Sequence, residues 1–104
     1  MSENVTTTPR RYDSIEEIIQ ANESIGHCWF SPSTTSFFRS KVYPEIYGGR
    51  FFVSSEKTSF DDPTRVYTVR EVNDRGAIVP MYPREWHKTK AQAVGVARDA
   101  AREL

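Results

Sequence analysis

The sequence has only one cysteine, no long apolar run and no net charge, and each of these absences excludes a class of protein. Cys28 has no second cysteine to pair with, so an internal disulfide cannot form and a reducing compartment is expected. No stretch approaches the roughly 20 apolar residues of a membrane span, and the N-terminus lacks the apolar segment of a signal peptide. The 14 basic and 14 acidic residues give no overall field toward nucleic acid or lipid. A cytoplasmic protein without membrane contact is therefore predicted.

The residues that are present are typical of one folded domain. The chain has 104 residues, of which 38% are hydrophobic and 27% charged, enough for a single core. Residues 1–12 are polar, rich in threonine and interrupted by Pro9, so we expect a disordered N-terminal tail there. Residues 13–104 are expected to form one α+β domain, since they contain neither a linker nor an internal repeat.

Two helices are marked by capping signals at their starts. Ser14 and Glu17 match a capping box, an apolar face follows, and Gly26 stands where a helix often ends. Residues 89–92 (Thr-Lys-Ala-Gln) repeat the signal before an alanine-rich stripe, which predicts a helix over about 90–102. Because that stripe is mostly alanine, the helix could lie close against a sheet.

Three strands are predicted between these helices, at 50–55, 65–72 and 77–82, from their β-branched and aromatic residues. Residues 73–76 (Asn-Asp-Arg-Gly) are typical of a hairpin turn whose glycine adopts a positive φ. Ser31-Pro32 carries the start signal of a short helix that would end at about residue 39 or 42. The predicted fold is α+β: a three-stranded antiparallel meander packed on the last helix, in the order α-α-β-β-β-α.

Catalysis would depend on Cys28, with His27 beside it in the sequence and His87 further along. A nucleophilic cysteine needs a base or a helix N-terminus that maintains its thiolate, and neighbours in sequence need not have that geometry. Two histidines and one cysteine without paired spacing also fall short of a zinc site. We therefore expect no enzyme, no metal and no cofactor, and keep a small Cys28/His27 enzyme as the third hypothesis.

Eight aromatic residues fall between residues 29 and 52, which is the most unusual feature of the sequence. A small domain must bury large side chains, so a core role is expected for most of them. The functional alternative is that Trp29, Tyr43 and Tyr47 lie at the surface as anchors for a protein partner. On this leading hypothesis the chain is a non-enzymatic module that binds an unidentified protein.

Arg65, Arg70, Lys88 and Lys90 support a second hypothesis, nucleic-acid binding through the sheet and the start of the last helix. Arg65 and Arg70 are five residues apart on one predicted strand, so they point to opposite faces. If the Arg70 face is buried, the guanidinium needs a carboxylate such as Glu56, and a structural ion pair is expected. An exposed sheet edge or an aromatic patch could also pair two copies of the chain.

The chain resembles a family of small uncharacterised proteins of bacteriophages and mobile elements. The resemblance covers about residues 13–101 and is carried by 27–32 (HCWFSP), 37–40 (FFRS), 50–56 (RFFVSSE) and 66–71 (VYTVRE). It implies an accessory phage gene acting in a bacterial host, and it implies no activity.

Two weaker similarities concern the fold alone. Residues 64–104 are similar to the arm-site-binding domain of tyrosine integrases, and the element order is similar to that of double-stranded RNA-binding domains. The dense basic surface that both families use on phosphates is missing from this sequence. Both similarities are therefore fold analogies, which do not establish function.

Overall fold

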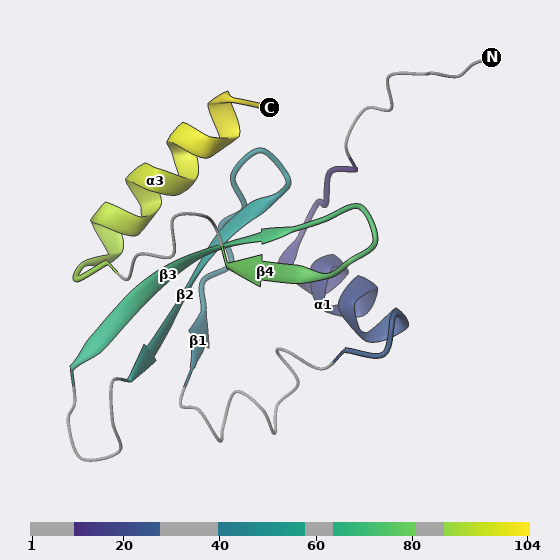
Figure 1. The fold of residues 1–104 in the computed structure, drawn as a ribbon, viewed down its shortest axis with the longest axis horizontal. Helices are drawn as coiled ribbons and strands as arrows, with labels where there is room; N and C mark the ends of the chain where they lie inside the picture. The colour runs from purple at the N-terminus through teal and green to yellow at the C-terminus, as the bar shows by residue number, and fades with distance from the viewer. Residues whose placement is uncertain (1–9, 28–39, 58–63, 81–86) are drawn as a thin grey trace.

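A computed structural model describes residues 10–27, 40–57, 64–80 and 87–104. The described residues form two helices and four strands, coloured in chain order in Figure 1. In that order the elements are α1 (Ile15–Ser24), β1 (Lys41–Val42), β2 (Phe51–Lys57), β3 (Arg65–Val72), β4 (Ile78–Pro80) and α3 (Lys90–Arg102). No helix in these ranges has the length and apolar composition that crossing a membrane requires.

The four strands form one antiparallel sheet in the order β1-β2-β3-β4. β2 and β3 pair continuously, from Phe51 opposite Glu71 to Lys57 opposite Arg65. The predicted three-stranded meander is present, but the sheet has a fourth strand, β1, at its edge. Two residues are too few to produce an alternating pattern, which is why β1 escaped prediction. Most of the predicted short helix, residues 31–39, lies outside the described ranges.

Both predicted capping signals are used at the helix starts. Ser14 Oγ accepts a hydrogen bond from the Glu17 amide at 3.2 Å, and Thr89 Oγ1 accepts one from the Gln92 amide at 3.2 Å. The return bond differs from a standard capping box, because the Glu17 carboxylate accepts from the amide of Asp13, one residue before the cap. The sequence therefore located both helix starts correctly.

The predicted turns are also confirmed. Gly76 has φ of 98° and Gly26 has φ of 85°, the left-handed conformation that favours glycine. Asn73 Oδ1 accepts hydrogen bonds from the amides of Arg75 at 2.9 Å and Ala77 at 3.0 Å. This local network closes the β3–β4 hairpin, because the asparagine side chain replaces a backbone partner.

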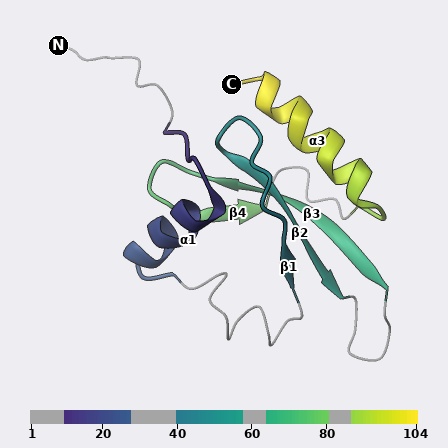
Figure 2. The same ribbon diagram turned by 180° about the vertical axis from the view of Figure 1, so that it is seen from behind.

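The sheet separates two hydrophobic cores, since successive strand residues point to opposite faces. Phe52 faces α1, whereas the adjacent Phe51 faces α3. Figure 2 shows α1 beside β4 and α3 alongside β3. The α1-side core contains Tyr12, Ile15, Ile18, Ala21, Phe52, Val72 and Ile78, and the α3-side core contains Phe51, Val53, Val69, Ala93 and Ala97.

Residues 10–12, which the composition places in a loose tail, pack onto the fold. Tyr12 is only 3% exposed and belongs to the α1-side core. Its amide donates to the carbonyl of Gly49 and its hydroxyl to the carbonyl of Asn73, each at 2.8 Å. The ordered part therefore begins no later than Arg10. One buried aromatic in a polar segment produces no periodic pattern, so the burial of Tyr12 could not be predicted from the sequence.

Candidate functional site: a basic tyrosine face beside the last helix

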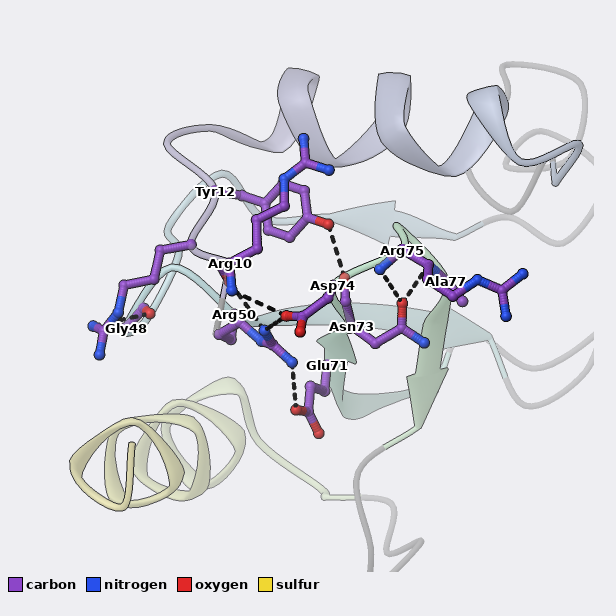
Figure 3. A network of polar contacts seen from close by, with 10 residues as sticks. Arg10, Tyr12, Gly48, Arg50, Glu71, Asn73, Asp74, Arg75 and Ala77 are labelled. Carbon is purple, nitrogen blue, oxygen red and sulfur yellow. Dashed lines mark hydrogen bonds and ion pairs between the residues drawn. The ribbon is translucent and has the colours of Figure 1, made fainter. Parts of the chain in front are cut away.

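Arg50 lies in the middle of the network of polar contacts drawn in Figure 3. Its side chain is almost completely buried, and Nη1 donates to a carboxylate oxygen of Asp74 and, at 3.0 Å, to the carbonyl of Arg10. Nη2 lies 3.5 Å from a carboxylate oxygen of Glu71. The same Asp74 oxygen accepts a hydrogen bond from the Arg10 amide at 3.0 Å. One guanidinium thus joins the N-terminal segment, the start of β2 and the β3–β4 turn.

The electrostatics of this network indicate a structural role. The Arg10 amide and the Arg50 guanidinium hold the pKa of Asp74 below its ordinary value, because both stabilise the ionised carboxylate. Arg50 already has two carboxylates beside it, so its charge is not available to a ligand. The buried Nε of Arg50 has no hydrogen-bond partner among the described residues, a cost that the other contacts offset. Sequence reasoning missed this network, and an arginine directly after Gly48-Gly49 was its only local signal.

Arg70 lies on the α1-side face of the sheet and forms the ion pair that the sequence predicts. Its Nη2 lies 3.5 Å from Glu56 Oε2, and its Nε donates to Ser54 Oγ at 2.8 Å. Ser54 and Thr68 donate their hydroxyls to the same carboxylate at 2.8 and 3.1 Å. The Glu56 carboxylate thus contacts Arg70, Ser54 and Thr68 together, which satisfies its hydrogen-bonding capacity in a half-buried position.

Arg65 points to the opposite face, as predicted from its spacing to Arg70. Its Nε donates to Ser55 Oγ at 3.0 Å and its Nη2 to the Ser55 carbonyl at 3.1 Å. Ser55 Oγ also lies 3.3 Å from the hydroxyl of Tyr43. Ser55 therefore connects a cation at the start of β3 with an aromatic ring that follows β1.

Tyr43 in turn contacts β3 and the first turn of α3. Its ring stacks on that of Tyr67 with centroids 6.2 Å apart and planes inclined at 29°. Lys90 Nζ lies 4.3 Å from the centroid of the Tyr43 ring, within the range of a cation–π interaction. Lys90 also lies 3.9 Å from a carboxylate oxygen of Glu45.

These contacts and the strand register define one continuous surface. Lys41 is opposite Ser55, which is opposite Tyr67, and Lys57 is opposite Arg65, so these side chains share the α3-side face. Figures 1 and 2 show the end of β2 and the start of β3 extending past the first turn of α3. We call this surface the basic tyrosine face; it consists of Lys41, Tyr43, Lys57, Arg65, Tyr67 and Lys90.

The other predicted contact residues lie in different places. Tyr47 is half-buried against the α3-side core, with its ring centroid 6.0 Å from the Arg98 guanidinium. Lys88 is exposed just before α3, and its amide donates to the Gln92 side chain at 3.1 Å. Trp29 lies outside the described residues. The structure thus brings Tyr43, Arg65 and Lys90 together and leaves Arg70 on the other face.

The residues considered for catalysis and metal binding are not assembled into a site within the described ranges. His27 is exposed, with Nδ1 3.5 Å from the Asn22 side-chain amide, and Cys28 lies outside those ranges. His87 pairs with Tyr67 through two backbone hydrogen bonds of 2.9 Å. In the same ranges, no three His, Cys, Asp or Glu residues lie close enough to hold a metal ion.

Comparison with other proteins identifies a family but no described activity. Neither the curated proteins nor the solved structures contain a match to this chain. A family described as being of unknown function, DUF7447, matches residues 14–97. The matched range runs from the cap of α1 into α3, and it includes the whole sheet and every residue of the basic tyrosine face. The chain therefore belongs to the DUF7447 family.

Proposed function

We propose that the protein is a non-enzymatic module that binds a partner protein through the basic tyrosine face. We further propose that it is encoded by an accessory gene of a bacteriophage or mobile element and acts in the bacterial cytoplasm. The observation that supports the binding role is the fixed array of Tyr43, Tyr67, Arg65 and Lys90 where the sheet extends past α3.

The array suits binding because its side chains are held in place before a partner arrives. Arg65 makes two hydrogen bonds to Ser55, and Tyr43 contacts Ser55, Tyr67 and Lys90. A side chain that is already ordered loses little conformational entropy on binding. Tyrosine and arginine are also among the residues that dominate binding energy at protein interfaces. Trp29 remains a proposed additional contact.

The second proposed function, nucleic-acid binding, would use part of the same face. Arg65 and Lys90 lie on it, which favours this alternative, whereas Arg70 faces the other side and pairs with Glu56. The protein would then have fewer phosphate contacts than the four cations suggest. A steep loss of affinity with added salt would be expected, because binding would depend on counterion release.

A capture experiment with two matched variants tests the proposed function. The tagged protein is used to capture binding proteins from nuclease-treated and untreated bacterial lysate. Lys90→Ala removes the cation over Tyr43 and places the best helix former in the first turn of α3. Arg102→Ala is the control, because that side chain is 76% exposed and its ion pair among the described residues is with Asp99, on the same helix.

The proposal predicts one captured protein that survives nuclease, is depleted with Lys90→Ala and is retained with Arg102→Ala. Circular dichroism verifies that both variants are folded. Equal capture by a folded Lys90→Ala variant would contradict a role for the face. Loss of the captured material after nuclease treatment would favour the nucleic-acid alternative.

A further inference from the structure

We propose that residues 10–12 form a strap that holds two turns together and detaches from them as a unit while the rest of the domain stays folded. The turns are residues 47–50, before β2, and the β3–β4 turn, and Figure 3 shows how the strap contacts both. They lie at the end of β2 and β3 opposite to the basic tyrosine face, since these strands are antiparallel. The strap and the proposed binding face are therefore separate features.

The backbone of Arg10 is held by one ion pair rather than by a strand. Its amide donates to Asp74 and its carbonyl accepts from Arg50, each at 3.0 Å. The Asp74 side chain is 60% exposed, so water can replace the Arg10 amide at this carboxylate when the strap opens. Exchanging such a bond for a bond to water costs far less than leaving a buried group without a partner. The polar contacts of the strap are therefore reversible.

The apolar attachment of the strap is a single side chain. Tyr12 is buried, whereas Arg10 and Arg11 are exposed. By contrast, α1 buries four of its residues. Segments with few buried apolar contacts open at a lower free-energy cost than the core. The strap is therefore expected to open before α1 leaves the sheet.

The chain has a suitable hinge directly after the strap. Asp13 is exposed, and its amide donates to the Glu17 carboxylate at 2.7 Å. Ser14 Oγ accepts a hydrogen bond from the Glu17 amide at 3.2 Å. These contacts cap the start of α1 without any atom of the strap, so α1 keeps its cap when residues 10–12 leave.

The strap rests on a part of the 47–50 turn that has no side chain to lock it in place. A Cβ at Gly49 would meet the Cβ of Arg11 at 2.7 Å, so this close approach requires glycine. The strap can therefore lift off Gly49 without displacing a side chain of the turn. The Arg11 guanidinium lies 3.4 Å from the carbonyl of Gly48, which is long for a hydrogen bond and holds the strap only weakly.

Hydrogen exchange of the full chain, followed by NMR in increasing urea, tests whether the strap opens locally. The amides of Arg10 and Tyr12 are compared with amides of the β2–β3 ladder. A local opening exposes little surface, so we expect both strap amides to have the same protection and to exchange at rates that do not depend on dilute urea. The ladder amides should exchange faster as urea is added. Strap amides that follow the urea dependence of the ladder would overturn the inference, as would a Tyr12 amide that stays protected while Arg10 exchanges freely.

Asp74→Asn tests whether the ion pair with Arg50 keeps the strap closed. The substitution removes a charge that the Arg10 amide and Arg50 both contact, so exchange of the Tyr12 amide should become about tenfold faster. Asp99→Asn is the matched control, because it removes an arginine-paired carboxylate on α3, and it should leave this rate unchanged. An unchanged rate in Asp74→Asn would contradict the role of the ion pair. The urea measurement uses the unsubstituted protein, so it remains decisive even if a variant fails to fold.

Discussion

Arg50 illustrates how one buried charge can connect segments that are distant in the sequence. Its partners Glu71 and Asp74 are 34% and 60% exposed, so water can solvate both carboxylates if the guanidinium is removed. The substitution would then lower stability mainly through lost packing and lost hydrogen bonds in the Arg50 network, because it would not leave two carboxylates buried and unpaired.

We predict that Arg50→Ala lowers the free energy of unfolding by about 2–3 kcal/mol, measured by urea denaturation. The exposed Arg102→Ala should change it by less than about 0.5 kcal/mol. If both variants unfold at the same urea concentration, the Arg50 network does not stabilise the fold.

The lowered pKa of Asp74 predicts how this part of the network depends on pH. A carboxyl group whose pKa is depressed in the folded state stabilises the protein above its unfolded pKa, and this contribution disappears as pH falls through the folded value. Asp74→Asn keeps an oxygen that can accept from the Arg10 amide, but it removes the charge that Arg50 contacts.

We therefore expect Asp74→Asn to be less stable than the wild type near neutral pH. The difference should shrink as pH falls below the ordinary value of 3.8. Urea denaturation of both proteins across this range measures the difference. A difference in stability that stays constant down to the lowest pH measured would show that the ionisation of Asp74 does not stabilise the fold.

Among the secondary-structure elements, a glycine in a turn and a glycine in a helix differ in whether the fold has room for a side chain. Gly76 closes the β3–β4 hairpin with φ of 98°. A Cβ placed there would meet the carbonyl oxygen of Ala21 in α1 at 2.6 Å. The turn can thus pack against α1 only because it ends in glycine.

We predict that Gly76→Ala destabilises the protein by about 2 kcal/mol or more, since it combines a strained φ with a clash against backbone. Thermal unfolding followed by circular dichroism measures the effect. An unfolding temperature equal to that of the wild type would mean that the turn and α1 can separate without cost.

The opposite change is expected in α3. Gly95 lies inside the helix, and a Cβ there would meet nothing within 4 Å. Gly95→Ala should stabilise the protein by about 0.5–1 kcal/mol, because alanine lowers the entropy of the unfolded chain and favours the helix. The same thermal measurement applies, and a lower unfolding temperature would contradict the packing of α3 described above.

At the scale of the whole molecule, β2 contributes to both cores. Phe52 faces α1 and Phe51 faces α3, so both helices pack on this strand, from its two sides. Disruption of one core should therefore loosen the other, as expected for a small domain that unfolds in one transition.

We predict that Phe52→Ala costs about 3–5 kcal/mol, and that amide hydrogens of α3 exchange faster in the variant even though Phe52 does not face α3. Hydrogen exchange measured by NMR distinguishes the two helices. Undisturbed protection of α3 would show that the two cores unfold independently.

The local features of the fold were predictable from neighbouring residues. Ser14 and Thr89 begin the two helices, Gly76 ends the hairpin turn, and β3 occupies the predicted range 65–72. Each of these depends on hydrogen bonds and dihedral preferences that extend over no more than a few residues. The antiparallel pairing of β2 with β3 and β3 with β4 followed from the connections between them.

Longer-range features could not be predicted in the same way. The residues on the basic tyrosine face were partly predicted from the sequence, but Lys41, Lys57 and Tyr67 were not, because their position depends on strand register and on where α3 crosses the sheet. Arg50 and Asp74 are 24 residues apart, and Arg10 and Asp74 are 64 apart. Neither separation leaves a periodic signal in the sequence.

The amino-acid sequence by itself determined the helix starts, the hairpin turn, the α+β class and the opposite directions of Arg65 and Arg70. Only the tertiary structure decided that Tyr12 is buried, that Arg50 joins three segments, and that Lys90 lies over Tyr43. The physical reason is the distance along the sequence over which each interaction acts. Helix caps, turns and the alternation of strand side chains are set by the backbone geometry of adjacent residues, whereas contacts between distant side chains form only when the sheet and helices pack together.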